Sequence, residues 1–198
     1  FERQEKMFDE GDRKREQIRS LEELEQYNKE MRSRFKEEMG ERPETGEPLD
    51  AKVMKVCDMG DYTLENIIFR SYSHTYVTAN MYLPKGITYP APAVLFASGH
   101  TEDGRMDKKY TRVCQILVQA GLIVFAIDPV GQGERSDYFD PETGEYQVMR
   151  AVRDHNACGI PAVAAGIYLE QYFVRDQERA LDYMMTRPEI DPKRIGMT

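Results

Sequence analysis

Two short apolar runs dominate the hydrophobic pattern of the chain. The first, Ala93–Ala97, ends at a Ser-Gly-His-Thr loop, and the second, Leu122–Ile127, ends at Asp128 and a loop with two glycines. Between them, an amphipathic pattern from Asp107 to Ala120 predicts a helix. Apolar runs without alternation, joined by a helix, are typical of a buried parallel β-α-β unit. Ligands of such sheets bind beyond the carboxyl ends of the strands, so we expect any active site at these two loops.

Alternating residues upstream of this unit predict antiparallel strands. Ala51–Met59 is a candidate first strand, and Leu64–Tyr72 and Thr75–Leu83 form a hairpin around a Ser-His turn. The alternation in the second arm predicts one buried face and one exposed face. His74 in the turn is expected to be solvated rather than catalytic, since no acidic partner lies near it in the sequence.

The N-terminal part of the chain is dense in alternating charge. Its apolar residues recur at spacings of three and four, which predicts one amphipathic helix with the stripe Ile18, Leu21, Leu24, Tyr27, Met31, Phe35 and Met39. We interpret this helix as packed on its own domain, with a partner-binding or dimerising helix as the alternative. The expected organisation is a charged helical extension over residues 1–48 and a second domain over residues 49–198.

Beyond the second apolar run, the pattern changes again. Residues 137–157 are polar with turn signals, which predicts a binding loop or an insertion. Ile160–Val174 predicts an apolar helix with Pro161 in its first turn. Asp176–Arg187 predicts an amphipathic helix whose inward residues are Ala180, Leu181, Met184 and Met185. Arg194–Thr198 predicts the start of another strand.

Composition narrows the classes of function. The 198 residues carry a net charge of −8, which argues against a nucleic-acid partner because phosphate binding needs an excess of Lys and Arg. The three cysteines have no metal-ligand spacing and are expected as reduced thiols, so they indicate no metal site. No apolar run approaches the roughly 20 residues of a membrane span. The compartment and a homo-oligomeric state stay open.

Three ordered motifs follow the predicted strands. They comprise Gly99-His100, then Asp128 with Gly131, Gly133 and Ser136, and last Asp176 with Arg179–Tyr183 and Arg187–Gly196. Together, over roughly residues 60–198, they resemble the α/β-hydrolase superfamily, in particular its acetyl xylan esterase-like and dipeptidyl-peptidase-like branches. The resemblance implies an α/β fold with a mostly parallel sheet, an N-terminal antiparallel hairpin and helices on both faces. It also implies that the chain is cut before the nucleophile turn.

A function follows from this resemblance. It implies a serine hydrolase that acts on carboxylic esters, in particular acetyl esters of carbohydrate, through an acyl-enzyme. The resemblance implies no metal and no organic cofactor. The serine, acid and histidine are expected beyond Thr198, in a remaining C-terminal half, so these residues alone are expected to be inactive. The alternatives are a peptidase or another acyl hydrolase of the same fold, and a hydrolase-fold binding protein without a nucleophile.

The resemblance also implies roles for residues of the two loops. The backbone N–H of His100 or of Thr101 would supply the oxyanion hole. The candidate substrate-binding residues are Gly99, Gln132, Arg135 and His155. Asp128 is expected to accept backbone N–H groups. Asp154 and His155 could suggest a catalytic dyad, but adjacent side chains often point apart, so a substrate-lining or solvated role is expected.

Overall fold

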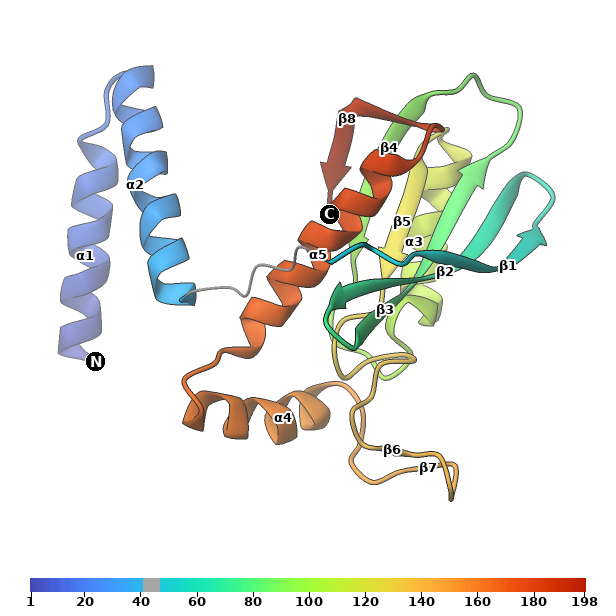
Figure 1. The fold of residues 1–198 in the computed structure, drawn as a ribbon. Coiled ribbons are helices and arrows are strands. Elements are labelled where there is room, and N and C mark those ends of the chain that lie inside the picture. The colour runs from blue at the N-terminus through green and yellow to red at the C-terminus, as the bar shows by residue number, and fades with distance from the viewer. Residues whose placement is uncertain (41–46) are drawn as a thin grey trace. The chain divides into compact units, whose positions relative to one another are not determined.

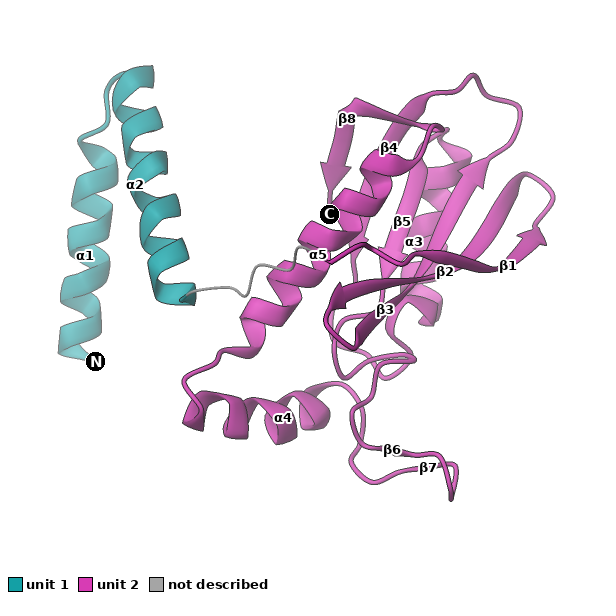
Figure 2. Cartoon of the chain, viewed as in Figure 1, with its two compact units in different colours: residues 1–41 teal, residues 42–198 magenta. Residues whose placement is uncertain are grey.

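The computed structural model describes residues 1–40 and 47–198 (Figure 1). The chain divides into two compact units, Phe1–Glu41 and Arg42–Thr198 (Figure 2). Among the described residues no single helix is both long and apolar enough to cross a membrane. Helices α4 (Val152–Ala164) and α5 (Leu169–Thr186) meet the length and composition only when combined across the 109° bend between them.

The first unit contains two helices, α1 (Glu2–Glu16) and α2 (Leu21–Met39). The prediction of one continuous helix is wrong, because the helical structure is interrupted around residue 18. Ser20 starts the second helix with a capping box: its hydroxyl accepts the N–H of Glu23, and the Glu23 carboxylate accepts the N–H of Ser20. Neither helix buries a residue. Whether the apolar stripe packs on its own domain or on a partner stays a prediction.

The second unit is built on a six-stranded sheet with the order β1-β2-β3-β5-β4-β8 (Figure 1). The strands are β1 Lys52–Asp58, β2 Tyr62–Tyr72, β3 Thr75–Pro84, β4 Ala91–Ala97, β5 Ile123–Ile127 and β8 Ile190–Met197. The first three strands and the β3–β5 pair are antiparallel, while β4 is parallel to both β5 and β8. Val94 pairs with Val124, which confirms the predicted parallel unit.

Helices cover both faces of this sheet. Helix α3 (Lys108–Gln119) buries Cys114 and Val118 against one face, and α5 buries Ala180, Tyr183 and Met184 against the other. The hydrophobic core consists of two clusters, one on each face of the sheet. Alternate residues of β5 pack into one cluster and then the other, because successive side chains of a strand point to opposite faces. The prediction of a half-exposed β3 is wrong, because this strand lies inside the sheet and is covered on both sides.

The helical segment after β5 differs from its prediction. Helix α4 ends before Gly166, whose φ of +77° closes a Schellman motif with bonds from Gly166 N–H to Val163 O (3.0 Å) and from Ile167 N–H to Ala162 O (2.9 Å). The predicted helix Ile160–Val174 is therefore two helices, and Pro161 lies inside the first rather than in an initial turn.

Three further predictions for this region need correction. The polar segment 137–157 contains a small hairpin, β6 (Phe139–Asp140) and β7 (Glu145–Tyr146), and also the start of α4. Helix α5 begins at Leu169, well before Asp176. Its residues Leu181 and Met185, predicted to face inward, are 41% and 55% exposed, because α5 packs on the sheet through Ala180, Tyr183 and Met184.

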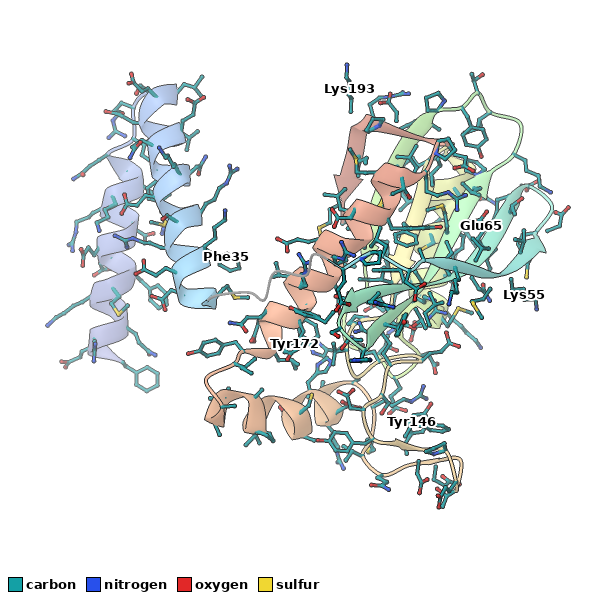
Figure 3. The ribbon with its side chains drawn as sticks, viewed as in Figure 1. Phe35, Lys55, Glu65, Tyr146, Tyr172 and Lys193 are labelled. Carbon is teal, nitrogen blue, oxygen red and sulfur yellow. The ribbon has the colours of Figure 1, made fainter. Side chains whose placement is uncertain are left out.

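One arginine fastens the end of α5 to the sheet. The Arg187 guanidinium binds Glu65 of β2 with two hydrogen bonds (2.7 and 3.2 Å) and Glu189 with two more (3.0 Å each). It also donates to the Tyr183 hydroxyl (3.0 Å). Figure 3 labels Glu65 at its place in β2. Hydrogen bonding from Arg187 lowers the pKa of the Glu189 carboxyl. This network sets where the chain turns from α5 into β8.

Candidate active site

Two loops meet at the carboxyl edge of the parallel strands, one after β4 and one after β5. The Thr101 N–H donates to the Gln132 side-chain oxygen (2.6 Å), and the Gly133 N–H donates to the Glu102 carbonyl (3.0 Å). The Arg105 N–H donates to Asp128 Oδ1 (2.8 Å). Three hydrogen bonds therefore join the two loops into one unit.

Asp128 is the centre of this unit and is fully buried. Its carboxylate accepts the Thr78 hydroxyl (2.7 Å), the backbone N–H groups of Arg105 and Glu134, and the Arg105 guanidinium. The expectation that Asp128 accepts backbone N–H groups is confirmed. Gly133 has a φ of +58°, and a Cβ there would overlap the Asp128 carboxylate. The tight geometry of this loop therefore requires glycine.

The structure distinguishes the two oxyanion candidates by their partners. The Thr101 N–H is already bonded to Gln132, whereas the His100 N–H has no acceptor among the described residues. His100 lies near the ends of β4 and β8, where the Ala97 N–H donates to the Thr198 carbonyl (2.8 Å). An N–H without a partner at this edge is available to a ligand, and the role of either residue as an oxyanion donor stays a prediction.

A groove of about 890 Å³ opens beside these loops. Its lining brings together four of the candidate residues, Gly99, His100, Gln132 and His155. Side chains of α5 and β8, including Leu181, Met185 and Ile195, make its walls largely apolar. Three buried polar atoms in the lining have no hydrogen-bond partner within the described chain: Ser98 Oγ, Asp176 Oδ1 and Gln177 Oε1. All three atoms are buried, so none of them is exposed to a ligand in the groove.

Arg135 occupies a different environment. Its guanidinium donates to Asp176 Oδ2 (2.6 Å) and to the Asp128 carbonyl (2.8 Å), and the side chains of Arg135 and Asp176 are 7% and 2% exposed. This buried ion pair ties the loop after β5 to α5. The expected contact of Arg135 with substrate stays a prediction.

His155 does not form a dyad with Asp154. The Asp154 carboxylate accepts the Ser136 hydroxyl (2.7 Å), while His155 Nδ1 lies 3.0 Å from His100 Nε2 and His155 Nε2 lies 2.6 Å from the Val130 carbonyl. The two side chains have different hydrogen-bond partners, although both lie against Gly131. The structure pairs His155 with His100 instead.

Asp137, Asp154 and Cys158 form a cluster whose ligand-type atoms lie within 4.8 Å of one another. Burial, with help from the nearby carboxylates, raises the pKa of the Cys158 thiol to about 11. Partial burial and the Asp154 charge raise the pKa of the Asp137 carboxyl. These shifts favour protonated groups, whereas a metal ion needs deprotonated ligands. The expectation of no metal stays a prediction.

Two important residues escaped the sequence reasoning. Arg105 is 4% exposed and binds Asp128, Asn80 and Glu134, but these partners are distant in sequence, so no local signal marks it. Phe173 lines the groove against the His155 ring (centroids 5.2 Å apart). Because Phe173 lies in an apolar run, the sequence predicted a core residue there and not a residue of the groove.

The fold and these loops agree with a known family. The acetyl xylan esterase (AXE1) family model matches residues 19–198. The chain belongs to the acetyl xylan esterase family. The match includes α2 and the whole sheet, so it extends further toward the N-terminus than the sequence motifs indicated.

Individual relatives are similar over about half of their own length. YtaP of Bacillus subtilis, provisionally named a hydrolase, is 23% identical over 80% of this chain and 51% of its own length. A provisionally named acetyl xylan esterase of Bacteroides fragilis is 22% identical with a TM-score of 0.70, covering 90% of this chain and 48% of that one. The acetyl xylan esterase of Paenibacillus sp. R4 is 20% identical with a TM-score of 0.55, covering 77% and 46%. These structures share the α/β-hydrolase fold with this acetyl xylan esterase family member.

Proposed function

We propose that the protein is a serine hydrolase that removes acetyl groups from carbohydrate esters through an acyl-enzyme. Family membership supports the ester substrate class. The observation that carries the proposal is the unpartnered His100 N–H at the rim of the groove, beside the end of β8. In this fold the strand in the position of β8 leads to the nucleophilic serine. The oxyanion of a tetrahedral intermediate would then accept the His100 N–H.

The proposed mechanism assigns the remaining groups to residues that follow Thr198. The serine attacks the ester carbonyl carbon, and a histidine takes the hydroxyl proton and passes it to the leaving alcohol. Water, activated by the same histidine, then hydrolyses the acetyl-enzyme to acetate and free serine. Loss of one oxyanion donor typically costs about 2.7–4 kcal/mol of transition-state stabilisation, so the loop that aims the His100 N–H matters for the rate.

The test uses the full-length gene product. Acetate release from acetylated xylo-oligosaccharides is measured, and a fluorophosphonate probe is used to find the nucleophile by peptide mass spectrometry. We expect acetate release and labelling of one serine, and replacement of that serine by alanine should abolish both. The absence of both signals would overturn the proposal. Cleavage of peptides without ester hydrolysis would indicate a peptidase instead.

A further inference from the structure

Two histidines, one from a loop and one from a helix, lie in contact at the groove. His100 follows β4 and His155 lies in the first turns of α4, yet His100 Nε2 is 3.0 Å from His155 Nδ1. The other His155 nitrogen lies 2.6 Å from the Val130 carbonyl oxygen. Phe173 packs edge-on against the His155 ring. Both ring nitrogens of His155 therefore have hydrogen-bond partners, and the Phe173 ring packs against the imidazole.

This geometry fixes the direction of each hydrogen bond in the neutral pair. A carbonyl oxygen only accepts, so His155 Nε2 carries the proton and His155 Nδ1 is an acceptor. His100 Nε2 must then carry a proton and donate it to His155 Nδ1. What remains is His100 Nδ1, a lone-pair acceptor with no partner among the described residues. His100 is exposed and lines the groove, so this acceptor is accessible to a ligand.

We propose that the His100–His155 pair is a hydroxyl-recognition site for the alcohol part of the ester, with His100 Nδ1 as the acceptor and His155 as a positioning residue. This inference rests on the proposed function, because it takes the His100 N–H as the group that meets the ester carbonyl. The ring and the N–H belong to one residue, so a substrate whose carbonyl meets the N–H brings its neighbouring groups within reach of the ring.

The chemistry of the acyl group decides which part of the substrate is recognised. An acetyl group offers a methyl group and a carbonyl oxygen, and neither can donate a hydrogen bond to His100 Nδ1. The donor must therefore come from the alcohol, and a sugar supplies hydroxyl groups next to the ester. The group that His100 Nδ1 recognises is thus a free hydroxyl of the alcohol part, close to the ester.

The experiment compares two substrates in the full-length protein: a mono-acetylated xyloside with free hydroxyls and the same compound with those hydroxyls methylated. The wild type should prefer the free-hydroxyl substrate in kcat/KM by about 3- to 10-fold for one neutral hydrogen bond. His100→Phe keeps the backbone N–H and a ring but removes the acceptor, so this preference should fall to about 1. His155→Phe should reduce it in the same way, since His100 then loses its fixed orientation.

The controls separate this site from general damage. His74→Asn changes an exposed histidine in the β2–β3 turn, whose φ of +59° asparagine tolerates, and should keep the full preference. Ring ¹⁵N chemical shifts of histidine-labelled protein should show the Nε2–H form of His155. If the wild type hydrolyses neither substrate, the proposed function fails. If it hydrolyses both and His100→Phe keeps the preference, or His155 carries its proton on Nδ1, the inference is overturned while the function stands.

Discussion

The side-chain oxygen of Gln132 accepts the backbone N–H of Thr101 at 2.6 Å, although the two residues lie in loops from different strands. Gln132 is 2% exposed, so this bond is shielded from water. It joins the loop that carries His100 to the loop after β5. Gln132, which was expected to contact substrate, therefore also stabilises the loop that contains Thr101.

Gln132→Ala in the full-length protein should lower kcat for ester hydrolysis. The change leaves the partly buried Thr101 N–H without its acceptor, which should cost about 1 kcal/mol, and frees the loop to rotate. Gln132→Glu retains a side-chain oxygen as acceptor and should recover much of the rate. Steady-state kinetics and thermal unfolding of both variants provide the measurement. A Gln132→Ala enzyme with wild-type kcat and melting temperature would contradict this role.

Two glycines with positive φ should respond differently to alanine. At Gly166 nothing lies within 4 Å of an added Cβ. Gly166→Ala should therefore lower the free energy of unfolding by about 1–2 kcal/mol, because alanine disfavours the left-handed conformation. At Gly133 the same Cβ would overlap the Asp128 carboxylate as well. Gly133→Ala should therefore destabilise the protein by clearly more than Gly166→Ala in urea unfolding. Equal losses would show that the loop relaxes around the new methyl group.

The sequence predicted the parts of the fold that depend on local patterns. The runs around Val94 and Ile123 identified the parallel strands, because buried strands need unbroken apolar residues whatever their partners. The break at Gly166 was missed because the apolar run continues through it, and a Schellman motif depends on one residue. The Arg105–Asp128 contact was missed because only the fold brings these residues together.

Arg187 offers a test of non-local packing. Arg187→Lys keeps the charge but cannot hold Glu65 and Glu189 with paired hydrogen bonds, so we expect a loss of about 1–3 kcal/mol in unfolding free energy. Arg187→Ala leaves Glu65 without its arginine partner, 13% exposed, and should cost about 3–5 kcal/mol. A double-mutant cycle with Glu65→Gln should give a large coupling energy. Additive losses would contradict a direct interaction.

Two carboxyl groups near the site should shift stability with pH in opposite directions. The folded state raises the pKa of Asp137 through partial burial and the Asp154 charge, so its favourable contribution is complete below the unfolded pKa of about 3.9 and is lost as pH rises through the folded pKa. Hydrogen bonds from the Lys109 N–H and the Thr101 hydroxyl lower the pKa of Asp107. Its contribution is present above the unfolded pKa and is lost as pH falls.

Neutral substitutions at these two positions should therefore have opposite signs at pH 7. Asp137→Asn removes a charge that the folded state disfavours and should raise the melting temperature, with the gain disappearing toward pH 4. Asp107→Asn keeps an amide oxygen as helix cap but loses the charge-assisted bonds, so it should lower the melting temperature at pH 7. Thermal scans between pH 4 and 8 measure both differences against wild type. A melting-temperature difference between Asp137→Asn and wild type that does not grow more positive from pH 4 to pH 7 would contradict the raised pKa of Asp137.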